Sequence, residues 1–322
     1  MNLLASLPTV IGTAAIAPAL LVLWLVVAAD ERPGPPAKVW TAFFLGAASI
    51  SLLGVARAPF LSILAAPETP WVAQALHSIF GVALPEETVK ILVIVAVSAW
   101  RHRFADPMDT VVYGAAAGLG FAAYENLAYL VQHADMWRAL AALRSVLTVP
   151  FHGALGIIAG AYLAIGRAGT ALGAHRHHRD WARISSRILI LFAPVSLHAA
   201  FDFPLLTLQQ NADIAGAAQI ILESASVLIG FSSIAFAVRL VWRVGHHHAP
   251  RTETARERLS QLRRMWALLV VGGAAGFIGL VFVLTSILIG IALLIVTTTI
   301  YFLGRNRMRM RSQGFSSASG QG

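Results

Sequence analysis

Two adjacent glutamates and a lysine interrupt a long apolar stretch, in the sequence PEETVK at residues 85–90. The flanking residues, from Trp71 to Trp100, are typical of a membrane helix, in which a charge near the centre costs about 2.5–3.5 kcal/mol and usually lines a functional cavity. Glu86 and Lys90 are four residues apart, so they share one face of a helix, and the lysine favours the ionised glutamate. Such a carboxylate can act as a general base toward water.

Three further apolar stretches contain ionisable or polar side chains. Pairs that are four residues apart stack along one stripe of a helix, and a stripe that avoids lipid directs its polar groups into the protein. These residues are Phe121, Glu125 and Asn126 in the first stretch, His152 in the second, and His198 with Asp202 in the third.

Carboxylates and imidazoles together allow two kinds of hydrolytic chemistry. They can hold a divalent metal such as zinc, or they can stabilise an oxyanion and move protons without a metal. The chain has no cysteine, which excludes thiol nucleophiles, disulfides and thiolate metal sites. A metal would therefore need His152 and His198, completed by Glu86 or Glu125.

The composition indicates a multi-pass membrane protein. The 322 residues are 57% hydrophobic and only 12% charged, with a mean hydropathy of +0.72. Several apolar stretches reach about 20 residues, the length of helix that spans a hydrocarbon core of about 30 Å. The fold class is therefore predicted to be an all-α transmembrane bundle.

The apolar pattern predicts about nine helices, seven in a body and two in a C-terminal hairpin. A single helix over 266–303 would be roughly 57 Å long, too long for one crossing, so a turn is expected near Thr285. The predicted spans are 8–29, 39–65, 71–100, 109–131, 147–166, 184–204 and 214–243, followed by the hairpin within 266–304. The predicted domains are the body at 1–244, with a motif core at about 75–205, a polar cytoplasmic linker at 245–265, the hairpin, and a basic and then disordered tail at 305–322.

Charge placement predicts the orientation. Cytoplasmic loops of membrane proteins are enriched in lysine and arginine, and four alternate loops are basic here, whereas the intervening loops carry only Arg138 and Arg144. The N-terminus is therefore expected outside the cell membrane and the C-terminus in the cytoplasm. The net charge of +9, scattered over short loops, suits anionic lipids better than nucleic acid. The basic loops are 30–38, 101–108, 167–187 and 239–264.

This orientation places the polar residues of four helices at one depth, in the outer half of the membrane. Glu125, His198 and Asp202 fall late in helices that enter from the cytoplasm, and His152 falls about one turn into a helix that enters from outside. Pro85 permits a break that puts Glu86 in the first turn of the deeper part, where the helix dipole favours a carboxylate.

Glycines recur on two of the predicted helices and permit close helix packing, as small residues do in membranes. They are Gly114 and Gly118 in one helix and Gly153, Gly156 and Gly160 in the next.

Three short motifs occur in order: EETVK fits EExxK, FAAYE fits FxxxE and HAAFD fits HxxxD. Together with His152, this set resembles the PrsW intramembrane proteases, of the wider CAAX-protease and bacteriocin-processing superfamily. The resemblance covers about 75–205. It implies a membrane-embedded endopeptidase of the kind that cleaves a membrane-spanning anti-sigma factor on its extracytoplasmic side.

Carried over motif by motif, Glu86 and Glu87 form the activating pair, and Glu125, His198, Asp202 and His152 complete the catalytic set. Lys90, Phe121 and Asn126 are supporting residues. The resulting hypothesis is that Glu86 or Glu87 deprotonates a water molecule, His198 or His152 stabilises the oxyanion, and Asp202 orients His198. The resemblance leaves open whether a metal takes part.

The same residues allow other interpretations. A proton- or metal-coupled transporter also needs intramembrane acids and histidines, although the charges gather on one side and no inverted repeat is visible. A catalytically inactive scaffold that binds a membrane partner is a third class. Individually, Glu86–Lys90 could be a structural ion pair, and His152 a packing residue. The joint occurrence at one depth on four helices favours the protease.

Overall fold

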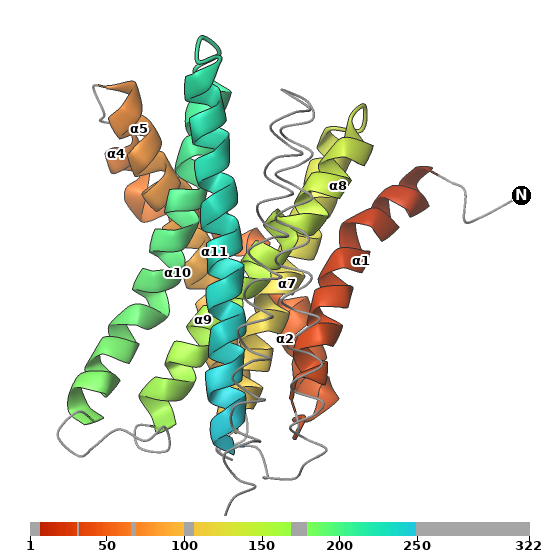
Figure 1. Ribbon diagram of the computed structural model, residues 1–322, viewed down its shortest axis with the longest axis vertical. Helices are drawn as coiled ribbons and strands as arrows, with labels where there is room; N and C mark the ends of the chain where they lie inside the picture. The colour runs from red at the N-terminus through yellow and green to blue at the C-terminus, as the bar shows by residue number, and fades with distance from the viewer. Residues whose placement is uncertain (1–6, 31, 66–68, 100–105, 169–178, 249–322) are drawn as a thin grey trace, which may run out of the picture. The chain divides into compact units, whose positions relative to one another are not determined.

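The computed structural model describes residues 7–30, 32–65, 69–99, 106–168 and 179–248 (Figure 1). Within these ranges the chain is helical and contains no strand. The predicted hairpin at 266–304, the tail at 305–322 and most of the predicted linker lie outside the described residues. The predicted class, an all-α membrane protein, is confirmed, and the predicted total of nine helices is not tested.

Seven long helical segments correspond to the seven predicted body helices, and one short helix is additional. Two of the seven are built from consecutive pieces, and the last two differ from the predicted ends by several residues. In chain order they are α1 (Leu7–Ala28); α2 (Pro36–Ala48), η2 (Ser49–Leu52), α3 (Leu53–Arg57), η3 (Ala58–Phe60) and α4 (Leu61–Leu64); α5 (Pro70–Leu76), η4 (His77–Ala83) and α6 (Leu84–Ala99); α7 (Pro107–Gln132); the additional α8 (Trp137–Val146); α9 (Thr148–Ala168); α10 (Arg179–Gln210); and α11 (Ala217–His248).

Five stretches of the described chain are long and apolar enough to cross a membrane. The stretches that carry most of the buried charges, α5–α6 and α7, are not among them. The five are Pro8–Ala28, Pro36–Leu64, Trp137–Arg167, Ile184–Gln210 and Ala217–Gly245.

The sequence permits a break at Pro85, and in the structure the helix continues through this residue. The preceding segment η4 is a π-helix, and the chain continues directly into α6. In an α-helix the ring of proline collides with the carbonyl group four residues earlier, and proline has no N–H to donate to that carbonyl. A wider π-turn at that point relieves the collision. Glu86 and Glu87 nevertheless lie in the first turn of α6, as predicted.

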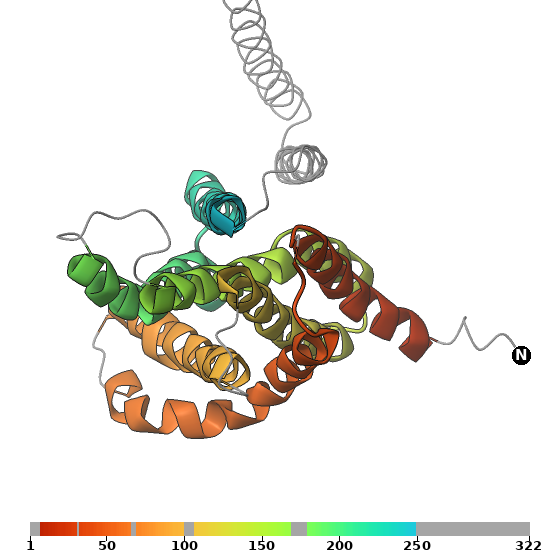
Figure 2. The same cartoon turned by 90° about the horizontal axis from the view of Figure 1, so that it is seen from below.

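Helix α7 forms the centre of the bundle and packs against α9, α1 and α2 (Figure 2). Its side chains are buried almost continuously from Met108 to Ala123. A Cβ atom on Gly114 would overlap the carbonyl of Gly156, and one on Gly118 would overlap the carbonyl of His152. The predicted close packing of glycine helices is therefore present. It also fixes the position of His152, because that residue lies at the contact itself.

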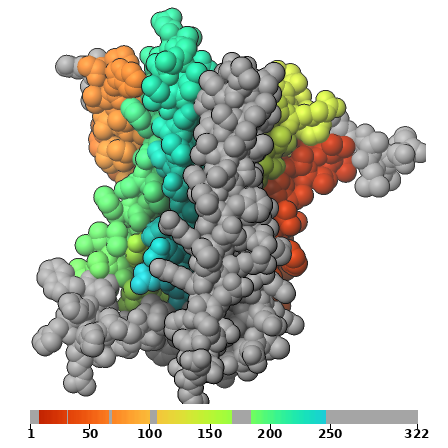
Figure 3. Space-filling view, in the orientation of Figure 1, coloured from red at the N-terminus to blue at the C-terminus, as the bar shows by residue number. Residues whose placement is uncertain are grey.

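Helix α8 lies on the surface of the body and is missed by the sequence analysis, which reads this region as a loop. Figure 3 shows α8 next to α1 on this face of the molecule. Ala141 of α8 is part of a small apolar cluster with Ile11 and Ala15 of α1, and Trp137 and Leu140 pack against that cluster. On α8 these residues recur at spacings of three and four, which is the pattern of an amphipathic helix. The helix carries Arg144 in its last turn.

Candidate active site

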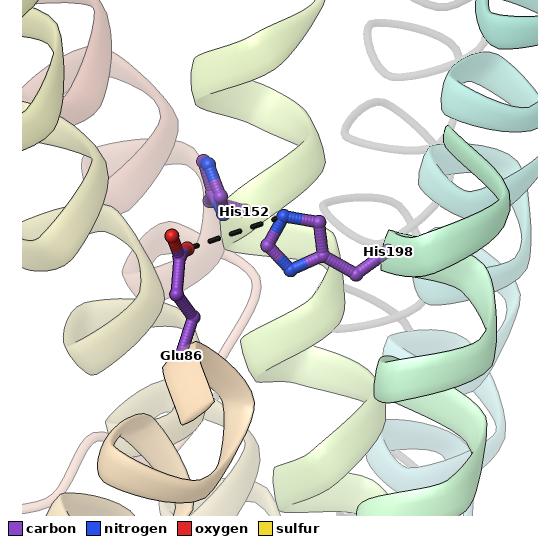
Figure 4. A group of neighbouring side chains, drawn as sticks. All are labelled: Glu86, His152 and His198. Atoms are coloured by element: carbon purple, nitrogen blue, oxygen red, sulfur yellow. Dashed lines mark ion pairs between the residues drawn. The ribbon is translucent and has the colours of Figure 1, made fainter. Parts of the chain in front are cut away.

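The structure brings the six proposed catalytic side chains together from four helices, and Figure 4 shows three of them, Glu86, His152 and His198. Helix α6 contributes Glu86 and Glu87, α7 contributes Glu125, α9 contributes His152, and α10 contributes His198 and Asp202. The rings of His152 and His198 are 5.1 Å apart between centroids and nearly perpendicular. The site is thus formed by residues that are remote in sequence.

Lys90 lies at the innermost part of this cluster and is 1% exposed. Its Nζ atom lies 2.8 Å from Oε1 of Glu87, 3.4 Å from Oε2 of Glu86 and 3.1 Å from Nδ1 of His152. The ammonium group also lies 3.9 Å from the centre of the Phe121 ring, a cation–π contact. All three donors of the ammonium group are therefore used, and both glutamates have a positive neighbour.

The contacts of His152 determine where its proton lies. A protonated lysine only donates, so Nδ1 of His152 accepts from Lys90 and the ring proton is on Nε2. That Nε2 lies 3.0 Å from Oε2 of Glu125, to which it donates. Glu125 therefore fixes the tautomer and the orientation of this ring, as a carboxylate behind a functional histidine commonly does.

His198 is held between two carboxylates. Its Nδ1 lies 2.8 Å from Oε1 of Glu87, and its Nε2 lies 3.2 Å from Oδ2 of Asp202. Both acceptors are carboxylate oxygens, so a ring with N–H groups on both nitrogens satisfies both contacts. Asp202 contacts His198 as the sequence hypothesis requires, and the contact from Glu87 is additional.

Glu86 and Glu87 have different surroundings although they are adjacent. Oε1 of Glu87 receives two short contacts, from Lys90 and His198, and its side chain is 1% exposed. Glu86 is held by longer contacts: 3.4 Å to Lys90, 4.0 Å to Nε2 of His198 and 3.9 Å to Arg57. Glu86 is therefore the more weakly held of the two carboxylates, whereas Oε1 of Glu87 has two short contacts with protein partners.

Asn126, proposed as a supporting residue, does not touch the reacting groups. It is fully buried; its amide donates to the carbonyl of Ala15 in α1, and its Oδ1 accepts from Nε of Arg144. Asn126 therefore connects α7 to α1 and α8. Glu223, the other acid of an apolar helix, accepts from Gln219 on α11 and is not part of the cluster.

Arg144 was treated in the sequence as a loop residue, and the structure places it in the site. From α8 its guanidinium lies 2.9 Å from Oε2 of Glu125 and stacks over the Tyr129 ring at 4.2 Å. Glu125 thus accepts from both Arg144 and His152. The recurrence of apolar residues at 137, 140 and 141 was the signal that could have located this helix and its arginine.

Replacing Arg144 by alanine should remove one of the two groups that hold the Glu125 carboxylate. His152, which donates to that carboxylate, should then be held less firmly in its orientation. Losing a hydrogen bond to a partly buried charged group costs about 1–3 kcal/mol, and losing such support for a functional histidine typically costs 10–100-fold in activity. We expect a lower melting temperature and a roughly 10–100-fold lower kcat in a peptidase assay. Arg138→Ala on the same helix is the control, because Arg138 packs over Trp137 and contacts no acid of the site. Equal effects of the two substitutions would contradict this role.

Arg57 is a second residue that the sequence did not assign to the site. In the structure its guanidinium lies 3.9 Å from Oε1 of Glu86, and its side chain is 41% exposed. Glu125 and Asp202 are also partly exposed, at 22% and 19%. These three residues are the partly exposed members of the cluster.

The types of the donor atoms fit a divalent metal. Glu86, His152 and His198 each offer one ligand atom, and these atoms lie within 4.8 Å of one another. Two histidines and a glutamate are a known zinc ligand set, which leaves a fourth position for water. An ammonium group repels a cation, so Lys90 would have to move away from His152 and Glu86 before a metal could bind.

Comparison with known proteins identifies the family of this chain. The family model described as "PrsW family intramembrane metalloprotease" matches residues 34–239. The chain belongs to the PrsW family. The Protease PrsW of Bacillus subtilis is 30% identical over 198 residues, which is 61% of this chain and 83% of the relative. That of Oceanobacillus iheyensis is 31% identical over 191 residues, 59% of this chain and 80% of the relative. No solved structure matches.

Membership of the PrsW family makes this chain an intramembrane peptidase. The matched region begins in the segment before α2 and ends within α11, so it includes every residue of the cluster described above. The resemblance inferred from EETVK, FAAYE and HAAFD is therefore confirmed at the level of the family.

Proposed function

We propose that this PrsW-family protease hydrolyses a peptide bond of a membrane-spanning protein near the outer leaflet, with an anti-sigma factor as the candidate substrate. The observation that carries the proposal is the convergence of Glu86, His152 and His198, whose ligand atoms lie within 4.8 Å of one another. Three side chains of the cluster are partly exposed, and they give water and a peptide a route to this centre. These side chains are Glu125, Asp202 and Arg57.

Glu86 is proposed as the general base. Its Oε2 lies 4.0 Å from Nε2 of His198, a separation at which one water molecule can hydrogen-bond to both at about 2.8 Å. Glu86 takes a proton from this water as its oxygen attacks the peptide carbonyl carbon. The same proton then passes to the leaving amine as the C–N bond breaks. Glu87 and Lys90 are positioning residues in this scheme, since their own contacts are with protein groups.

His198 is proposed to stabilise the oxyanion. When the carbonyl carbon becomes tetrahedral, its oxygen gains negative charge, and preorganised donors at that point contribute most of the rate. The Nε2 of His198 faces Glu86 as well as Asp202, so a modest rotation brings its N–H to the carbonyl oxygen. His152 donates its Nε2–H to Glu125 and accepts from Lys90 at Nδ1, so in this arrangement it positions these two groups and the oxyanion role falls to His198.

A metal, if bound, would be held by His152, His198 and Glu86. It would polarise the carbonyl and acidify a bound water. Elemental analysis of the purified protein tests this: one zinc per chain that is lost in His152→Ala supports a metal site. If metal-free protein hydrolysed the substrate at the normal rate, Glu86 would activate the water molecule without a metal.

Reconstituted protein with a single-span substrate provides the test of function. We expect a cleavage product whose new terminus lies near the outer end of the substrate helix, and its absence with Glu86→Gln. Ion flux through liposomes tests the transporter class in the same preparation. Flux that depends on Glu86 without cleavage of any single-span substrate would overturn the proposal.

The orientation of the chain is also proposed: nine crossings, with the N-terminus outside and the C-terminus in the cytoplasm. Because the chain has no cysteine, single cysteines report the side of each loop without background. We expect Asp135→Cys to react with a membrane-impermeant maleimide in intact cells, and Arg103→Cys to react only after permeabilisation. Labelling in the opposite sense would invert the bundle and place the site near the cytoplasm.

A further inference from the structure

A cavity lies between α9 and α10, far from the catalytic cluster. Its volume is about 510 Å³, and it is lined by Tyr162, Leu163, Gly166, Arg167, Ser186, Arg187 and Ile190. Arg167 follows His152 by 15 residues on α9, and Arg187 precedes His198 by 11 residues on α10. At 1.5 Å per residue these positions are roughly 22 and 17 Å from the histidines, so the cavity is a separate site.

The lining combines positive charge with apolar surface. Arg167 and Arg187 are both exposed, and neither has an ion-pair partner in the described part of the chain. None of the seven lining residues is acidic. Tyr162 and Ser186 supply hydroxyl groups beside the arginines, whereas Leu163 and Ile190 supply the apolar wall. Ile184 and Ile188, on the adjacent turns of α10, are 50% and 60% exposed and extend the apolar surface outward.

We propose that this cavity binds an anionic glycerophospholipid. The phosphate group would be held between the guanidiniums of Arg167 and Arg187, which donate in pairs to phosphate oxygens, with its acyl chains against Leu163, Ile190 and Ile188. Charge complementarity selects this occupant, because two cations with no ion-pair partner among the described residues favour an anion and the apolar wall favours one that carries a hydrocarbon chain. The loop 167–187 is basic, so this end of the bundle is the one expected in the cytoplasm, where anionic lipids concentrate.

The bound lipid would join the ends of the two helices that carry the catalytic histidines. Helices α9 and α10 pack along their length and bring His152 and His198 to 5.1 Å between ring centroids. At the cavity the two arginines repel each other across the gap unless an anion lies between them. A phospholipid therefore stabilises the pair of helices, and with it the folded body.

The test compares lipid binding by the full-length wild-type chain and a double variant, Arg167→Gln/Arg187→Gln, using native mass spectrometry. Dioleoylphosphatidylglycerol and dioleoylphosphatidylcholine compete in the same micelle, so acyl chains are matched. We expect the variant to bind phosphatidylglycerol roughly 30-fold more weakly, the equivalent of about 1 kcal/mol for each lost guanidinium, with phosphatidylcholine unchanged. Arg187→Gln alone should weaken binding by roughly 5-fold. This single variant tests the site even if the double variant fails to fold.

Arg239→Gln/Arg243→Gln is the matched control, because it removes two exposed arginines of α11 that do not line the cavity. It should bind phosphatidylglycerol as the wild type does. Equal losses in both double variants would indicate general surface charge and overturn the site. Inorganic phosphate, added at millimolar concentration, should neither displace the lipid nor raise the melting temperature. Stabilisation by phosphate alone would mean that the ligand is a soluble anion, and the proposal would fail.

Discussion

Glu86→Gln should abolish most peptide-bond hydrolysis and leave the protein folded. General-base catalysis contributes about 10²–10⁴-fold, so we expect kcat to fall by that factor. The contacts of Glu86 are long, 3.4 Å to Lys90 and 3.9 Å to Arg57, so glutamine should change the melting temperature little. The measurement is turnover of a reconstituted single-span substrate, together with thermal unfolding in the same detergent.

Two variants make this prediction specific. Glu87→Gln should lose activity and stability together, because Glu87 accepts short contacts from both Lys90 and His198. Glu223→Gln, on α11 and outside the cluster, should lose neither. If Glu87→Gln were the stable and inactive variant and Glu86→Gln the unstable one, the two roles would have to be exchanged. Normal turnover by Glu86→Gln would remove the general base from the mechanism.

Lys90→Met should have the largest effect on stability. Methionine has a similar length and no charge, so the substitution leaves two buried carboxylates without their common counter-ion. Breaking a buried ion pair by removing one partner typically costs 3–5 kcal/mol, and this lysine has three polar partners. We expect an unfolding free energy that is lower by at least that amount, measured by reversible denaturation in mixed micelles.

A double-mutant cycle separates the ion pair from loss of packing. Glu87→Gln combined with Lys90→Met removes both charges. The double variant should therefore lose less unfolding free energy than the two single variants lose when their losses are added. Lys38→Met, at the other lysine of the chain, is the control and should be nearly neutral. Strict additivity of the two substitutions would show that Lys90 and Glu87 do not interact energetically.

The sequence is sufficient to predict the main helices because hydrophobic length and charge are local properties. It also indicates which polar residues meet, since each of them is costly in lipid and all of them must find partners. The sequence alone is therefore sufficient to select four candidate site residues, which are Glu86, Glu125, His152 and His198. The relation of Glu86 to Lys90 follows from spacing on one helix alone.

The features that were missed depend on contacts between distant segments. Arg144 and Glu125 are 19 residues apart, and Asn126 and Ala15 are 111 apart, so no helical spacing relates them. Arg144 also lies on a short helix whose polar face resembles a loop in composition. The sequence does not distinguish the π-helix at His77–Ala83 from a break at Pro85, because proline in a membrane helix is compatible with either outcome.

The placement of Lys90 on the same helix as the two glutamates has a consequence for biosynthesis. His198 follows Glu87 by 111 residues, and translation proceeds at about 5–20 residues per second, so the acids precede their histidine partner by roughly 6–22 s. During that interval the nascent segment carries its own neutralising cation, which lowers the cost of leaving the translocon. The newly made enzyme therefore cannot cut neighbouring chains until α10, which carries His198 and Asp202, has emerged from the ribosome and joined the other helices.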